Sequence, residues 1–241
     1  MTAPLPGSRG RWLLLGTALA QAAAPPFAGF DQGSGSDPVV VPPGPFFAIW
    51  GPVVLGCLAA AVWGLPLRRA TADPWRRVQL PLSLAQVGFV AWLVAAARLP
   101  VLTLPVFVGV LVALVACLRT VVTTPADRVT RLVLGGSVGL YAGWTSAAVW
   151  VNAATLLPEP AASATVPLAL LLSGAALTAA VLARVVHGQL AHVLAASWAL
   201  VGALVSSAGA GSVPLVVVAA VGLAVVGVAA GTATRHRVGA P

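Results

Sequence analysis

The sequence predicts an all-α, polytopic transmembrane helix bundle of about eight helices. Composition is the first of three observations: the 241 residues are 59% hydrophobic and 7% charged, with a mean hydropathy of +1.00. A soluble domain carries about 25% charged residues. Because a chain this apolar cannot cover its surface in water, we expect the lipid bilayer to surround it.

The second observation is a series of apolar runs, each near the length that crosses the roughly 30 Å core of a bilayer. Short polar or Pro- and Gly-containing segments separate them. In chain order, the runs cover approximately residues 12–28, 45–65, 78–97, 100–121, 132–157, 165–186, 189–208 and 213–233.

The third observation is the placement of the 13 basic residues, all of them arginine. With eight spans, only Arg98 falls on the side that also holds Asp31, Asp37 and Glu159, and the other twelve arginines fall on the opposite side. The positive-inside rule then predicts that both termini lie in the cytoplasm. Arginine as the sole basic residue type beside abundant Ala, Val and Gly suggests a GC-rich bacterial genome, so we expect a bacterial inner-membrane protein. The net charge of +8 is therefore a membrane-surface signal, and no nucleic-acid partner is predicted.

The first run and the loop after it each allow two interpretations. Two arginines followed by residues 12–24 also describe a secretory signal peptide, although we expect the helix to stay attached. The segment 29–44 is rich in Gly, Ser and Pro, and it is either a lid or a plain connector.

The sequence lacks residues that several classes of membrane protein and enzyme require. The chain has no lysine for a retinal Schiff base, and no acidic residue lies inside an apolar run, which argues against ion-coupled transport. No Walker motif, HExxH motif or Cys/His cluster occurs, so we predict no catalytic residues and no metal ligands. Cys57 and Cys117 are expected to be packing residues, and His187 and His192 snorkelling surface histidines rather than haem ligands.

The fifth run has one unusual face. At 100° per residue, an arc of about 80° gathers Tyr141, Trp144, Ala148, Asn152 and Thr155. Polar side chains are unfavourable against lipid, so this face should look into protein or a cavity. Helix packing through Gly139 and Gly143, a GxxxG pair, explains the face equally well.

At these residues the sequence resembles the TspO/MBR family of tryptophan-rich sensory or translocator proteins. Residues 140–157, LYAGWTSAAVWVNAATLL, look like its signature helix, which reads Pro-Tyr-x-x-Trp-x-Ser-x-Ala and then Leu-Asn. Leu140 and Val151 depart from that pattern. The second run follows Pro42-Pro43 and resembles the family's Trp-Thr-x-Leu-Tyr segment at Trp50. The third run matches poorly, with Phe89 where an asparagine is usual.

The resemblance covers approximately residues 10–158. It implies a five-helix core over 1–158, with three additional helices and a short basic tail over 159–241. Members are similar in binding planar hydrophobic ligands and are often homodimers. The ligand would be a porphyrin, haem or a sterol-like molecule rather than a bound cofactor. By matched position, the ligand-binding residues would be Trp50, Tyr141, Trp144, Ala148 and Asn152.

The expected function is therefore that of a membrane receptor or sensor and not of an enzyme, although some members have been credited with light-dependent porphyrin breakdown. Two alternatives stay open. The three additional helices could complete the path of a small-molecule transporter, or the aromatic face could hold a partner helix in an accessory subunit.

Overall fold

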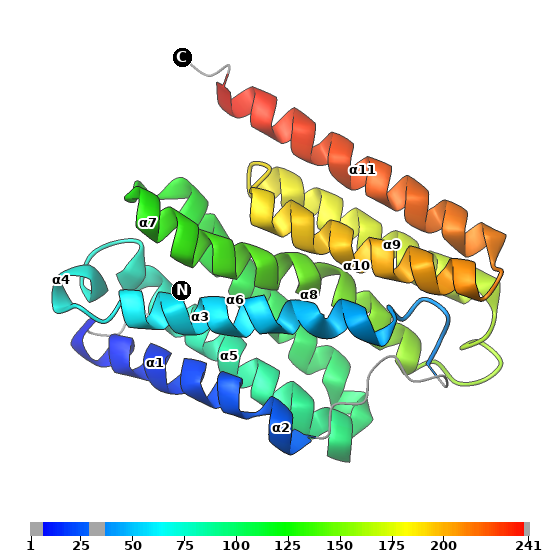
Figure 1. Ribbon diagram of the computed structural model, residues 1–241, viewed down its shortest axis with the longest axis horizontal. Helices are drawn as coiled ribbons and strands as arrows, with labels where there is room; N and C mark the ends of the chain where they lie inside the picture. The colour runs from blue at the N-terminus through cyan, green and yellow to red at the C-terminus, as the bar shows by residue number, and fades with distance from the viewer. Residues whose placement is uncertain (1–6, 29–36, 239–241) are drawn as a thin grey trace. The chain divides into compact units, whose positions relative to one another are not determined.

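The computed structural model describes residues 7–28 and 37–238, and all regular elements in these ranges are helices (Figure 1). The all-α prediction is confirmed. The chain forms two compact units: unit 1 comprises Met1–Phe30 and Trp50–Ala142, and unit 2 comprises Asp31–Ile49 and Gly143–Pro241. Residues 29–36 of the predicted loop lie outside the described residues. The expected division at residue 158 stays a prediction.

Unit 1 contains the helices of the N-terminal half, joined by short turns. They are α1 (Gly7–Ala23), α2 (Pro25–Ala28), α3 (Trp50–Trp63), α4 (Leu67–Ala70), α5 (Trp75–Arg98), η2 (Pro100–Leu102), α6 (Thr103–Thr123), α7 (Arg128–Thr130), the π-helical turn η3 (Arg131–Gly135) and the start of α8 (Gly136–Thr155).

Unit 2 contains the rest of α8 and the C-terminal helices. Its elements are the 3₁₀ helix η1 (Gly44–Ile49), α9 (Thr165–Val185), α10 (Leu190–Gly209) and α11 (Val213–Val238). Two glycines with positive φ, Gly188 and Gly211, form the tight turns on either side of α10. Glycine adopts this conformation without the steric penalty that a Cβ brings, so the chain can reverse within a few residues.

Seven helical stretches in the described residues are long and apolar enough to cross a bilayer. They are Gly44–Trp63, Trp75–Arg98, Pro100–Thr123, Arg128–Thr155, Thr165–Val185, Leu190–Gly209 and Val213–Arg235. These correspond to seven of the eight predicted runs, so the multi-pass prediction is confirmed. The first run forms α1, whose 17 residues lie at the lower end of the roughly 17–25 that a span needs.

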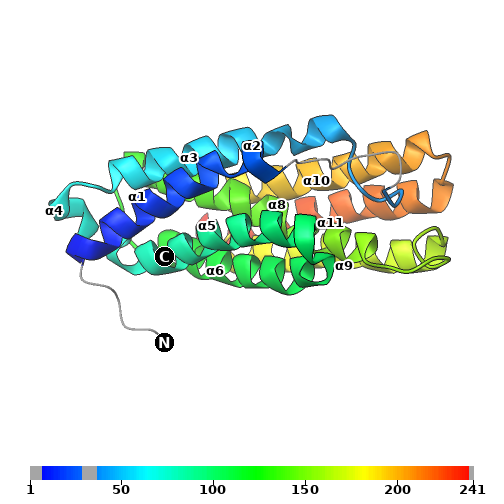
Figure 2. The ribbon, with the colours of Figure 1, turned by 90° about the horizontal axis from the view of Figure 1, so that it is seen from below.

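In unit 1, α1 is an integral part of the packing and lies against α3 and α5 (Figure 2). Leu14 and Ala18 are fully buried. The Thr17 hydroxyl donates a hydrogen bond of 2.6 Å to Oε1 of Gln86 on α5. At the other end of the helix, Nη1 of Arg11 donates to the carbonyl of Leu65 at 2.9 Å. These contacts bury one side of α1 in unit 1, and the expectation that α1 stays attached is still a prediction.

In unit 2, α11 lies along α9 and α10 (Figures 1 and 2). Small residues allow the close approach, as at Gly222, where an added Cβ would lie 2.7 Å from the Cβ of Ala176 on α9. Dispersion contacts at short range are what hold helices together in lipid, where no hydrophobic force acts between them.

The prediction for the two histidines was half right. His187 is exposed in the turn before α10. His192 is fully buried, with Nε2 3.3 Å from the carbonyl oxygen of Ala179 on α9. The surface prediction for His192 was wrong because α9 covers this side of α10, which residue spacing on a single helix does not reveal.

Candidate functional site

Two of the five predicted ligand-binding residues, Trp50 and Tyr141, lie together in unit 1. The ring centroids are 5.6 Å apart and the planes meet at 78°, an edge-to-face contact. Trp50 also contacts Phe89, with centroids 4.6 Å apart. The Tyr141 hydroxyl donates a 3.1 Å hydrogen bond to the carbonyl of Ala85 on α5, which orients the ring. Tyr141 is fully buried and Trp50 is 8% exposed.

These rings belong to a longer aromatic chain across α8, α3, α5 and α6. Phe89 stacks on Trp92 at 6.3 Å, and Trp92 stacks on Phe107 at 4.8 Å. Aromatic pairs at such distances stabilise beyond the area they bury, by about 0.5–1.5 kcal/mol each. Phe89, which departs from the family pattern, is therefore the central ring of this cluster.

Trp144, Ala148 and Asn152 belong to the part of α8 in unit 2. Trp144 is 2% exposed, and the ring of Phe47 from η1 meets it edge to face, with centroids 5.4 Å apart and planes at 80°. Ala148, one turn further along α8, is half-buried, and the Asn152 side chain is 8% exposed. An indole, a small side chain and a carboxamide thus follow one another at four-residue spacing, which is one helix face.

The segment η1 is held next to this face by α10. The indole Nε1 of Trp198 donates a 2.9 Å hydrogen bond to the carbonyl of Phe46, and the two rings are 4.6 Å apart. Gly202, also on α10, lets Pro42 and Phe46 approach closely, because an added Cβ would lie 2.6 Å and 2.9 Å from them. Sequence reasoning missed Phe46 and Phe47, although the adjacent aromatics after Pro42-Pro43 were the available signal.

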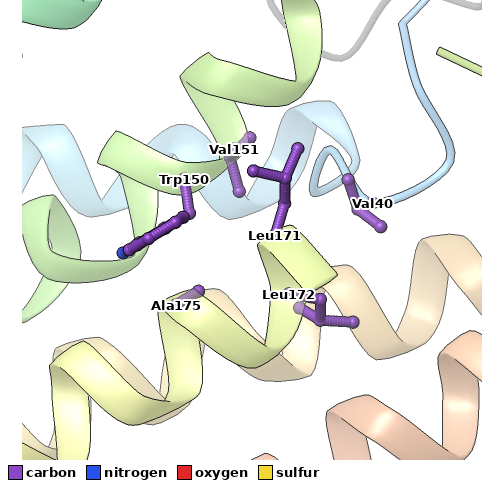
Figure 3. A pocket seen from close by; sticks show the side chains of 6 residues that line it. All are labelled: Val40, Trp150, Val151, Leu171, Leu172 and Ala175. Carbon is purple, nitrogen blue, oxygen red and sulfur yellow. The ribbon is translucent and has the colours of Figure 1, made fainter. Parts of the chain in front are cut away.

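Trp150 has a packing role in unit 2. Its Nε1 donates a 2.9 Å hydrogen bond to Oγ1 of Thr178 on α9, and its ring lies over Gly174. A hollow of about 10 Å³ adjoins the ring and is lined by Val40, Trp150, Val151, Leu171, Leu172 and Ala175 (Figure 3). That volume suits a single water at most. This side of α8 is therefore filled by protein.

Reactive groups are few in the part of the chain that the structure describes. No group of three His, Cys, Asp or Glu side chains is placed to hold a metal ion there. Cys57 and Cys117 are free thiols and fully buried, as expected of packing residues. The two aromatic clusters offer apolar surface and ring faces.

Comparison with known proteins identifies the family of the chain. The family model described as "TSPO-like protein" matches residues 13–232, a range that includes α9, α10 and most of α11. The three C-terminal spans are thus part of the match, although the motif resemblance ended near residue 158. No curated protein and no solved structure gives a significant match. The chain belongs to the TSPO-like protein family.

Proposed function

We propose that this protein is a membrane receptor or sensor that binds a planar hydrophobic molecule, such as a porphyrin, haem or a sterol-like compound. The observation that carries the proposal is the α8 face in unit 2, where Phe47 and Trp144 meet edge to face beside Ala148 and Asn152. Family membership supports the same class of function. Trp50 and Tyr141 are retained as candidate ligand residues because they pair in the same edge-to-face manner.

Each group on the α8 face has a role that its chemistry suits. The Trp144 indole offers a flat apolar surface for stacking. Ala148 leaves space that a larger side chain would fill, and the Asn152 carboxamide can both donate and accept a hydrogen bond to orient the ligand. Most drug-sized ligand sites combine an apolar lining with a few such polar groups.

Phe47 acts as a cover in this proposal. Trp144 is only 2% exposed, so a ligand must take the place of the Phe47 ring to reach it. The aromatic pair contributes about 0.5–1.5 kcal/mol beyond area burial, which the larger ring of a porphyrin replaces. The segment from Pro38 to Ile49 would then swing aside, which extends the lid interpretation of residues 29–44 to include η1.

For the cellular setting we propose the inner membrane of a bacterium with both termini in the cytoplasm. The support is the distribution of arginines, of which only Arg98 falls on the outer side. In this orientation η1 and the end of α8 lie toward the outside, and a ligand reaches Trp144 from there.

The test is a titration of the purified full-length protein with protoporphyrin, followed by quenching of tryptophan fluorescence. Trp144→Ala should weaken binding on the order of 100-fold, since stacking contributes about 1 kcal/mol and the lost apolar area about 2 kcal/mol. The matched control is Trp150→Ala, which removes the same side chain from the opposite side of α8. It should leave the affinity within about 3-fold of wild type, a difference below 0.7 kcal/mol.

Two outcomes contradict the proposal. Equal weakening by both substitutions, with equal loss of thermal stability, would mean that Trp144 only supports the fold. Absence of saturable binding to the wild-type protein at micromolar ligand would remove the receptor function.

A further inference from the structure

Two adjoining hollows open along the seam between α9 and α11 in unit 2. Their volumes are about 460 and 330 Å³, and both are lined by Leu177, Val221 and Val225. The close contact of Gly222 with Ala176 brings the two helices together within the seam. The side chains beside that contact are short, so the approaching helices leave a groove rather than a filled interface.

The groove is apolar along its length and basic at one end. Ser173 and Val217 line the end of the groove nearer the N-termini of α9 and α11, whereas Arg184 and Thr232 line the end nearer their C-termini. Both helices run in the same direction, because α10 returns the chain between them. From Ser173 to Arg184 the groove extends about 16 Å at 1.5 Å per residue. One leaflet of a bilayer core is about 15 Å deep, half of the roughly 30 Å total.

Among the described residues, the helices α9, α10 and α11 offer the basic end no acidic side chain. No Asp or Glu follows Glu159 in the sequence, and Glu159 precedes the opposite end of α9. The Arg184 side chain is exposed, and no ion pair joins it to another side chain in the described residues. Arg235 follows Thr232 by about one helical turn, so it adds positive charge at the same end of α11. An anionic group from outside these three helices can therefore pair with the basic end.

We propose that the seam of α9 and α11 binds one anionic glycerophospholipid of the surrounding leaflet. Its phosphate pairs with Arg184, for which the guanidinium offers a fork of donors. One acyl chain lies in the groove between Leu177, Val221 and Val225. A general attraction between arginines and anionic headgroups exists at any membrane surface. This site differs from a general surface attraction because the groove holds the acyl chain of the lipid while Arg184 binds its headgroup.

The experiment is native mass spectrometry of the full-length protein in detergent, titrated with phosphatidylglycerol and, separately, with phosphatidylcholine of the same acyl chains. Phosphatidylglycerol should bind about 10-fold more tightly, because the choline cation of phosphatidylcholine cancels the net negative charge that Arg184 and Arg235 attract. Arg184→Gln should abolish that preference. Val225→Trp should reduce retention of both lipids because the indole fills the groove.

Each substitution has a matched control in unit 1. Arg119→Gln removes an exposed arginine near the C-terminal end of α6, and Val112→Trp adds an indole to a lipid-facing position of the same helix that is 66% exposed. Both controls should bind lipid as the wild-type protein does. Equal losses in Arg119→Gln and Arg184→Gln would overturn the proposal in favour of general surface attraction. If Val225→Trp instead converts a dimer to a monomer without loss of lipid, the groove is an interface between two copies.

Discussion

Gly143 offers a sharp test of the helix packing that positions the candidate site. A Cβ at this position would overlap the carbonyl oxygen of His192 and would lie 2.9 Å from the Cβ of Ala195, both on α10. A carbonyl oxygen of the backbone cannot rotate away as a flexible side chain can. Gly143→Ala therefore forces α8 and α10 apart.

The magnitude follows from two opposing effects. Overpacking against a fixed neighbour costs about 3 kcal/mol, at the upper end of the usual range. The higher helix propensity of alanine stabilises the folded state by about 0.8–1 kcal/mol, which offsets part of this cost. The net loss of about 2 kcal/mol corresponds to a fall in Tm of about 4–8 °C for a chain of this size. The assay is thermal unfolding of the purified protein in detergent, followed by circular dichroism.

The control is Gly136→Ala in the same helix. A Cβ at Gly136 meets no atom within 4 Å, so only the propensity gain remains. Its Tm should rise by about 2–4 °C. If Gly143→Ala melts at or above the wild-type temperature, α8 and α10 are not packed as the structure has them, and Trp144 is not positioned by this contact.

Three further predictions concern topology, the N-terminus and pH. A cysteine at Ser34 should react with an impermeant thiol reagent in intact cells, and one at Thr71 should not. The native Cys57 and Cys117 are buried, so we expect them not to react. The reverse labelling pattern would mean that the membrane orientation is inverted. Mass spectrometry of the mature protein should find α1 attached, because Leu14 and Ala18 are buried in unit 1; a new N-terminus near residues 20–26 would show a cleaved signal peptide. Hydrogen bonds from the Thr130 hydroxyl and N–H lower the pKa of Asp127 below its ordinary value of 3.8. The ionised carboxylate therefore stabilises the folded protein above pH 3.8, and this stabilisation is lost as the pH falls through the lowered pKa. Asp127→Ala should therefore reduce the loss of Tm between pH 5 and pH 2, and parallel curves for the two proteins would refute this role.

The helices could be predicted from the sequence because a bilayer fixes their length and hydropathy. The run expected at 165–186 is Thr165–Val185 in the structure, and the run at 213–233 is part of Val213–Val238. The face of α8 was predictable for a similar reason, since the 3.6-residue period places Trp144, Ala148 and Asn152 on one side.

Contacts between distant segments could not be predicted in this way. Phe47 lies in a 3₁₀ segment, and nothing local indicates that its ring meets Trp144. His192 is buried by α9, whose carbonyl at Ala179 it faces. The family match beyond residue 158 was also missed, because α9, α10 and α11 consist mainly of Ala, Val and Leu, which form no distinctive motif.

The central claim is that a planar ligand binds at the α8 face covered by Phe47. The most direct measurement is photo-crosslinking of the full-length protein with a diazirine-bearing porphyrin, followed by peptide mapping. The cross-links should fall within residues 44–49 and 143–155 and should disappear when excess protoporphyrin competes. Cross-links confined to exposed residues of the span Val213–Arg235, unaffected by the competitor, would contradict the claim, because they would show partition of the porphyrin into lipid around the protein.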